Sequence, residues 1–232
     1  MFAPVLIKTY KMVQNKKTYY QIILDMSSSM GDCLNETING FNKQMESIEK
    51  LQEDHPEQEF LVSLTTFNSD CEIKFEFLKP SSSISLTKWS RWWHKSAYQI
   101  QYSPSGMTAL FDAIGNSCES IMQQANEELN NNHATVVVII ITDGHENASQ
   151  KYNSSEIKDM IKSLETTENW IFNYMSSTPD YVEYSKGMNI KMENTVCYNV
   201  ESMEKTFDDV SASMASYASK KKLNKKPSKF FK

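Results

Sequence analysis

An almost uninterrupted apolar segment, ATVVVIII at residues 134–141, constrains the fold of this chain more than any other feature. It is too short to cross a membrane as a helix, which takes about 20 apolar residues. It also lacks the polar alternation of a half-exposed strand, so it indicates a parallel strand buried on both faces. Asp143 and Gly144 follow it closely, and a second β-prone segment, Tyr19–Asp25, likewise ends on an aspartate.

Several segments repeat apolar residues every three or four positions, a spacing that predicts amphipathic helices. These segments lie at about 34–51, 110–129, 157–164 and 203–217. Ser154 or Ser155 is a suitable N-cap for the helix at 157–164. The tripeptide Thr178-Pro179-Asp180 predicts the start of a further helix, with proline at its first position.

Two segments joined by Asn-Ser-Asp, residues 59–67 and 71–77, predict a β-hairpin. The second one alternates between apolar and charged residues, which is typical of an exposed edge strand. Its alternation places four residues on one face: Cys71, Ile73, Phe75 and Phe77. Two short strands are predicted later in the chain, at 170–175 and 195–200.

The order of these elements predicts an α/β fold of the doubly wound, Rossmann-like type. We expect a mostly parallel central sheet with one antiparallel edge strand and helices on both faces. Residues 18–219 would form one domain, preceded by an N-terminal extension at 1–17 and followed by a basic tail at 220–232. The tail contains seven lysines and no acidic residue, so we expect it to be disordered.

Charge and cysteine usage bear on partners and compartment. Subtracting the seven positive charges of the tail from the net charge of −5 leaves −12 for residues 1–219. An acidic body argues against nucleic acid as a partner, because phosphate contacts dominate such binding. The N-terminus places apolar residues before its lysines, the reverse of a secretory signal. We therefore expect a cytoplasmic protein with no membrane contact, and reduced thiols at Cys33, Cys71, Cys118 and Cys197.

Oxygen-bearing side chains follow both central strands, and a third group stands before a helix. Asp25 and Asp143 close the two strands, and ligands of doubly wound sheets bind beyond such strand ends. Ser27 and Ser29 follow Asp25, and Thr108 precedes the helix at 110–129. Mg²⁺ prefers six oxygen ligands and commonly retains water. These five residues therefore predict a Mg²⁺ site, for which Mn²⁺ and Ca²⁺ are alternatives; Ser27 alone could instead cap a helix.

Three separated motifs carry a resemblance to a known family. They are DMSSS at 25–29, SGMTALFDAIG at 105–115 and IITDGHENAS at 140–149. Together they resemble the metal-ion-dependent adhesion site (MIDAS) of von Willebrand factor A (VWA) domains, in a form similar to stand-alone bacterial and phage proteins. The segment NYMSSTPD at 173–180 departs from the pattern of those relatives.

The resemblance implies a role for each residue of the site. The hydroxyls of Ser27, Ser29 and Thr108 would bind the metal directly, and Asp25 and Asp143 would act mainly through water. An aspartate or glutamate of a partner protein would complete the coordination. The resemblance thus implies a Mg²⁺-dependent protein-binding module without catalytic residues, and family analogy suggests an ATPase complex or a phage-related assembly as the partner.

Other polar and aromatic residues border the expected site. Asp112 is expected to orient its neighbours or to favour a helix N-terminus. His145 and Glu146 are expected in a solvated loop, where His145 could hydrogen-bond a group behind the ligands. Trp89 and Trp93 are four residues apart and could pack as core, which would leave Trp92 exposed near the mouth of the site as an interface anchor.

Two other functions compete with the binding module. A Mg²⁺-dependent phosphohydrolase on a similar fold would need a second aspartate two residues after Asp25, where this chain has Ser27. The motif segments also lack a lysine or arginine that would neutralise a phosphate. An RNA-binding protein would need a basic groove, which the acidic body does not suggest. The sequence therefore favours the binding module.

Overall fold

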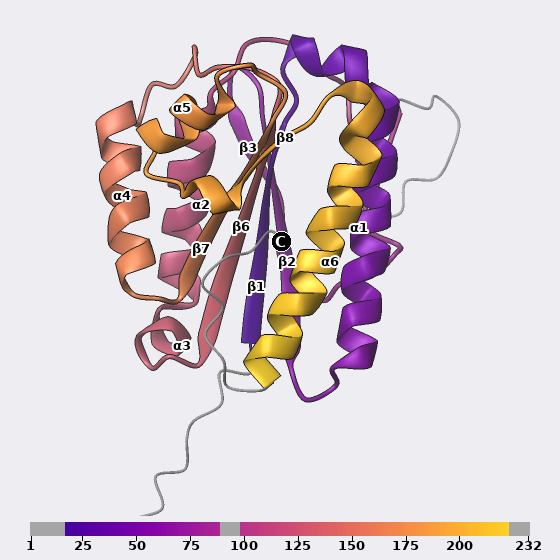
Figure 1. Ribbon diagram of the computed structural model, residues 1–232, viewed down its shortest axis with the longest axis vertical. Coiled ribbons are helices and arrows are strands. Elements are labelled where there is room, and N and C mark those ends of the chain that lie inside the picture. Colours follow the sequence, from indigo (N-terminus) through magenta and orange to yellow (C-terminus); the bar gives the residue numbers. More distant parts are fainter. Residues whose placement is uncertain (1–16, 89–97, 223–232) are drawn as a thin grey trace, which may run out of the picture.

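A six-stranded sheet in the order β3-β2-β1-β6-β7-β8 runs through the centre of the protein (Figure 1). Neighbouring strands are parallel except for β2 and β3, which pair antiparallel at one edge. The computed structural model describes residues 17–88 and 98–222. Helices cover both faces of the sheet, so the predicted doubly wound fold with one antiparallel edge strand is confirmed.

The strands of this sheet are β1 (Lys17–Asp25), β2 (Glu59–Phe67), β3 (Cys71–Leu78), β6 (Ala134–Thr142), β7 (Trp170–Ser176) and β8 (Thr195–Cys197). Two short strands, β4 (Ser85–Thr87) and β5 (Gln99–Gln101), pair with each other in a small separate sheet. The helices are α1 (Leu34–Asp54), α2 (Leu110–Gln124), α3 (Asn126–Asn130), α4 (Ser154–Thr166), α5 (Tyr181–Gly187) and α6 (Met203–Lys222). Short 3₁₀ turns occupy Ser28–Cys33, Met192–Asn194 and Val200–Ser202.

Strands β1 and β6 lie side by side at the centre because their sequences tolerate burial on both faces. All nine residues of β6 are buried, as its almost uninterrupted apolar character predicts. Even-numbered residues of β1, such as Ile22, face a core shared with α1 and α6. Odd-numbered residues, such as Ile23, face a second core shared with α2 and α4. Figure 1 shows these two helix layers on opposite sides of the sheet.

Edge strand β3 differs from the alternation that its sequence predicts. Phe75 packs on the α1 and α6 side of the sheet, whereas Cys71 and Phe77 pack on the α2 and α4 side. The pairing with β2 shifts register on both sides of Leu64, where β3 contains more residues than the facing part of β2. Phe77 also has a positive φ of 52°. Such bulges reverse the alternation of side chains, so the prediction of one shared face was wrong.

Several helix boundaries differ from the sequence prediction. The N-cap of α4 is Asn153 rather than Ser154 or Ser155, and it forms a capping box with Glu156. Helix α5 begins at Tyr181, after the turn at Thr178-Pro179-Asp180. The apolar repeat at 110–129, which predicted one helix, is divided between α2 and α3. Strand β8 ends at Cys197, three residues before its predicted end.

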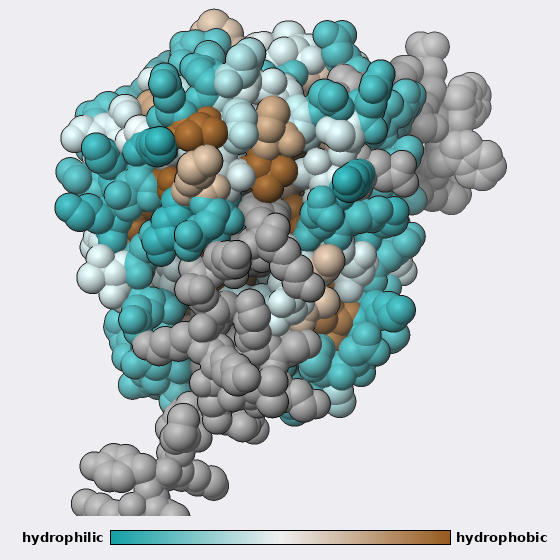
Figure 2. Space-filling model, viewed as in Figure 1, coloured by the Kyte–Doolittle hydropathy of each residue, from teal (hydrophilic) through white to brown (hydrophobic). Residues whose placement is uncertain are grey.

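Among the described residues, no helix is both long and apolar enough to cross a membrane. The four cysteines are free; Cys33 and Cys118 are buried, whereas Cys197 is exposed. Helix α6 continues to Lys222, into the predicted tail, and residues 223–232 lie outside the described residues. The tryptophans at 89, 92 and 93 lie outside them as well. Figure 2 shows mostly hydrophilic residues on the visible face, with small hydrophobic areas near α5 and β8.

Candidate metal centre

The carboxyl ends of β1 and β6 bring the predicted site residues together. Asp25 ends β1 and is fully buried, and its carboxylate accepts two hydrogen bonds. The Ser27 N–H donates to Oδ1 at 2.6 Å, and the Thr142 hydroxyl donates to Oδ2 at 2.5 Å. Tyr102 donates to the main-chain carbonyl of Asp25 at 2.5 Å. These bonds fix the turn that leads from β1 into the two serines.

The three hydroxyls and Asp143 face one region of this edge. Ser27 Oγ lies 3.2 Å from Ser29 Oγ, and the Ser29 hydroxyl donates to Asp143 Oδ1 at 2.6 Å. A Cβ atom added to Gly144 would lie 3.4 Å from Thr108 Oγ1 and 3.8 Å from Ser29 Oγ. The Thr108 and Ser29 hydroxyls therefore border the same space beside Gly144. The structure thus gathers Asp25, Ser27, Ser29, Thr108 and Asp143 in one cluster.

Burial makes both carboxylates harder to ionise. Burial raises the pKa of Asp25 to about 6, against the lowering effect of the bonds from Thr142 and Ser27. Burial also raises the pKa of Asp143, opposed by the hydrogen bond from Ser29. A nearby cation would reverse these shifts, because an opposite charge favours the ionised carboxylate. The two carboxylates are therefore suited to a positively charged ligand.

The loop that carries Thr108 is held from two sides. The Ser28 N–H and hydroxyl both donate to the Gly106 carbonyl, at 3.2 and 3.1 Å. The Met107 N–H donates to the hydroxyl of Ser69, in the turn between β2 and β3. Gly106 has a φ of +80°, and a Cβ there would lie 2.7 Å from Ser69 Oγ. Only glycine fits this conformation and this close approach without strain.

Asn147 and Glu146 join the loop after β6 to the start of α2. Asn147 accepts the Thr108 N–H through Oδ1 at 2.9 Å and donates its own N–H to the Thr108 carbonyl at 3.0 Å. Glu146 accepts the Phe111 N–H at 2.8 Å and the Ser149 hydroxyl at 2.7 Å. Glu146 lies in a loop, as predicted, and is half-buried there; its carboxylate also caps the first turn of α2. No role for Asn147 was predicted, because its bond to Thr108 joins residues 39 positions apart and local spacing gives no signal of it.

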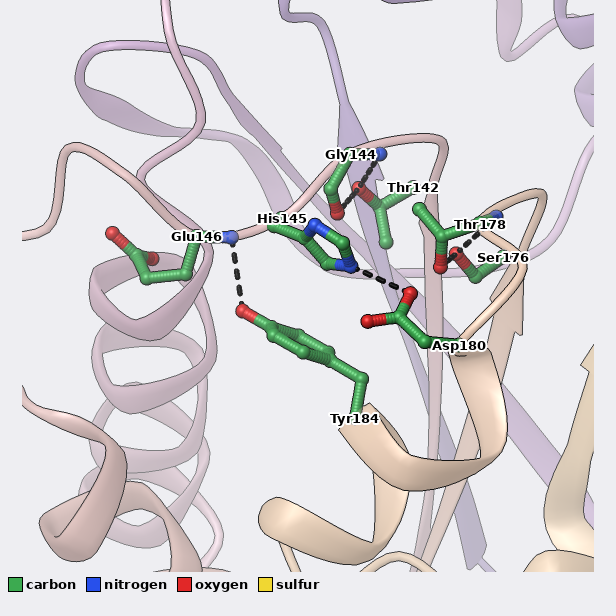
Figure 3. Close-up of polar contacts among 8 residues, drawn as sticks. All are labelled: Thr142, Gly144, His145, Glu146, Ser176, Thr178, Asp180 and Tyr184. Atoms are coloured by element: carbon green, nitrogen blue, oxygen red, sulfur yellow. Dashed lines mark hydrogen bonds and ion pairs between the residues drawn. The ribbon is translucent and has the colours of Figure 1, made fainter.

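Asp112 contacts the loop at residues 150–152, whereas His145 contacts Asp180 and Tyr184. Asp112, in the first turn of α2, accepts the backbone N–H groups of residues 150–152, each at 2.9 Å, and thereby orients that loop. His145 is exposed; its Nε2 lies 2.8 Å from Asp180 Oδ1, and its ring centroid lies 5.0 Å from that of Tyr184 (Figure 3). The contact with His145 lowers the pKa of Asp180. The predicted rim residue Trp92 lies outside the described residues.

The donor set consists of oxygen atoms. Within residues 17–88 and 98–222, no group of three or more His, Cys, Asp or Glu side chains could hold a metal ion. The cluster instead combines two carboxylates with three hydroxyls. Such neutral and anionic oxygen donors suit hard cations.

The matched family model agrees with this geometry. The model described as the von Willebrand factor type A domain matches residues 21–212, most of the chain. The chain belongs to the von Willebrand factor type A family. Strand β6, the C-terminal part of β1 and the loops that follow both strands lie inside the matched range of this VWA domain.

Solved structures share the fold at low sequence identity. The zinc-occupied MIDAS form of proximal thread matrix protein 1 from the mussel byssus has a TM-score of 0.59 at 15% identity, over 88% of this chain and 47% of that one. The ArnB paralog VWA2 from Sulfolobus acidocaldarius has a TM-score of 0.53 at 17% identity, over 83% and 44%. The minor pilin PilB from Streptococcus sanguinis has a TM-score of 0.56 at 11% identity, over 86% and 61%.

These comparisons show the fold of the VWA domain. The chain spans less than half the length of the mussel and Sulfolobus proteins that it matches. No curated protein sequence matches it.

Proposed function

We propose that this VWA domain is a Mg²⁺-dependent protein-binding module. Ser27, Ser29 and Thr108 would bind the metal through their hydroxyls, and Asp25 and Asp143 would hold it mainly through water. An aspartate or glutamate of a partner protein would fill the remaining position. The observation that carries this proposal is the convergence of the Ser27, Ser29 and Thr108 hydroxyls with Asp143 at one sheet edge.

The choice of Mg²⁺ follows from the donors. Zinc in proteins is bound mostly by cysteine sulfur and histidine nitrogen, whereas Mg²⁺ takes oxygen ligands and retains several waters. The mussel protein has a zinc-occupied MIDAS motif, which supports a divalent cation in this fold. The cation would supply the positive charge that attracts an acidic side chain. Because the direct protein ligands would be mostly neutral, much of that charge would remain available to the partner.

The state of Asp25 argues against the phosphohydrolase alternative. A carboxylate nucleophile must reach its substrate with a free lone pair. Asp25 has no exposed surface, and both of its oxygens already accept hydrogen bonds. Position 27, where such an enzyme would carry an acid or base, is a serine. These features suit a residue that holds the turn toward Ser27 and contributes its negative charge behind the cation.

Affinity capture from source lysate tests the proposed function. The wild-type protein and the Thr108→Ala variant are each used as bait, once in buffer with Mg²⁺ and once in buffer with EDTA. The matched control is Thr166→Ala, which removes an exposed threonine hydroxyl of α4 that donates to the Lys162 carbonyl of its own helix. We expect captured proteins in Mg²⁺ with wild type and Thr166→Ala, and their loss in EDTA or with Thr108→Ala. A captured set unchanged by EDTA and by Thr108→Ala would contradict the metal-bridged mechanism.

The setting in which the module acts stays a prediction. We propose a cytoplasmic location and a partner within an ATPase complex or a phage-related assembly. The identities of metal-dependent captured proteins test both points. Partners drawn from secreted or envelope proteins would contradict the proposed location.

A further inference from the structure

A hollow of about 260 Å³ lies between the first turns of α2 and α4 and helix α5. Phe111, Tyr184 and Met188 form apolar parts of its wall, and Asp180 and Glu183 add two carboxylates. Gly187 borders it where an added Cβ would meet nothing within 4 Å, so this side is open. Figure 2 shows hydrophobic surface near α5, in agreement with a partly apolar wall.

The hollow is tied to the metal centre through the loop after β6. Asp180 contacts His145, which lies two residues after Asp143. The Tyr184 hydroxyl accepts the N–H of Glu146 at 2.9 Å (Figure 3). One short segment, residues 143–146, therefore contributes to the metal centre and contacts two residues of the hollow. A partner whose acidic residue reached the metal would pass beside the hollow.

The size and charge of the hollow indicate which kind of side chain it would bind. Pockets for small-molecule ligands usually measure about 300–1,000 Å³, so this hollow suits a single long side chain better. Its lining residues include two acids and no lysine or arginine. Exposed Asp180 and Glu183 stand beside the apolar wall, a combination that fits a cationic head on an aliphatic stem. Arginine fits better than lysine, because guanidinium also stacks on aromatic rings such as Tyr184.

We propose that this hollow receives an arginine side chain of the partner, beside the acidic residue that binds the metal. The assignment to the same partner rests on the proposed function. The arginine site itself requires no metal. The domain would thus recognise an acidic and a basic residue held a short distance apart, and the metal centre alone would not set its specificity.

An NMR titration in EDTA tests the arginine site alone. The probes are N-acetyl-arginine amide and its neutral isostere N-acetyl-citrulline amide, and backbone signals of Glu183 and Gly187 are followed. A double variant that carries both Asp180→Asn and Glu183→Gln removes the two negative charges of the hollow. The control Glu53→Gln with Glu127→Gln removes two exposed acids elsewhere, on α1 and α3.

We expect the arginine probe to bind about two- to fivefold more tightly than the citrulline probe, as a favourable exposed charge pair allows. This preference should persist in the control variant and disappear in Asp180→Asn with Glu183→Gln. Equal binding of both probes, or loss of the preference in both variants, would overturn the proposal. Because EDTA is present, this result is independent of Mg²⁺ binding. Failure of the metal centre would leave the arginine site standing, and the reverse also holds.

Discussion

At the residue scale, the proposed metal centre would depend on hydrogen bonds behind its ligands. Thr142 is fully buried at the end of β6, and its hydroxyl reaches Asp25 on the neighbouring strand. That bond orients a carboxylate whose other oxygen holds the turn toward Ser27. Groups of this kind usually fix the orientation of metal-binding residues.

Replacement of Thr142 by valine should therefore weaken Mg²⁺ binding. The shape of the side chain is kept, but Asp25 loses one of its two hydrogen bonds. We expect Mg²⁺ affinity, measured by isothermal titration calorimetry, to fall about 10- to 100-fold. Thr66→Val is the matched control, because the buried Thr66 hydroxyl has no hydrogen-bond partner among the described residues. Equal affinities of Thr142→Val and Thr66→Val would contradict this role.

Asn147 allows a second test at this scale. Its side chain accepts the Thr108 N–H, so Asn147→Ala should leave Thr108 less firmly placed and lower Mg²⁺ affinity about tenfold. Asn147→Asp retains an acceptor oxygen and should restore most of the affinity. Titration calorimetry of both variants checks this. If aspartate were no better than alanine, the hydrogen bond to Thr108 would not be the reason for the effect.

At the element scale, apolar patterns located the strands but not their irregularities. The apolar run at 134–141 and the aspartates at 25 and 143 were sufficient to predict two central strands and a site at their ends. The bulges of β3 were not predictable, because they depend on pairing with β2. The bonds of Asn147 and Glu146 join segments far apart in sequence, so local spacing carries no signal of them.

The packing of α1 on α6 gives a prediction about stability. A Cβ atom added to Gly40 would lie 2.0 Å from Cδ2 of Phe207. Gly40→Ala should therefore overpack this contact and lower the free energy of unfolding by about 1–3 kcal/mol. Gly31→Ala, where nothing lies within 4 Å of the added Cβ, is the control. Urea unfolding of both variants measures the difference, and an undiminished stability of Gly40→Ala would refute the close approach.

At the scale of the whole molecule, a metal that binds only the folded state should stabilise it. At a Mg²⁺ concentration of 100 times the Kd, the gain is about 2.7 kcal/mol. For a chain of this size each kcal/mol raises Tm by about 2–4 °C, so we expect a rise of about 5–10 °C. Thermal unfolding followed by circular dichroism, with and without EDTA, checks this. At the same Mg²⁺ concentration the rise should fall to about half or less in Thr108→Ala, whose binding we expect to be at least about tenfold weaker; an undiminished rise in that variant would indicate Mg²⁺ binding elsewhere.

The central claim is that Ser27, Ser29 and Thr108 form one Mg²⁺ site with Asp25 and Asp143. Titration of metal-free protein with Mg²⁺ in a calorimeter tests it most directly. We predict saturable binding by wild type and by Thr166→Ala, and binding at least about tenfold weaker for Ser27→Ala and for Thr108→Ala. Wild-type protein that binds no Mg²⁺, or binds it as tightly without the Ser27 and Thr108 hydroxyls as with them, would contradict the account.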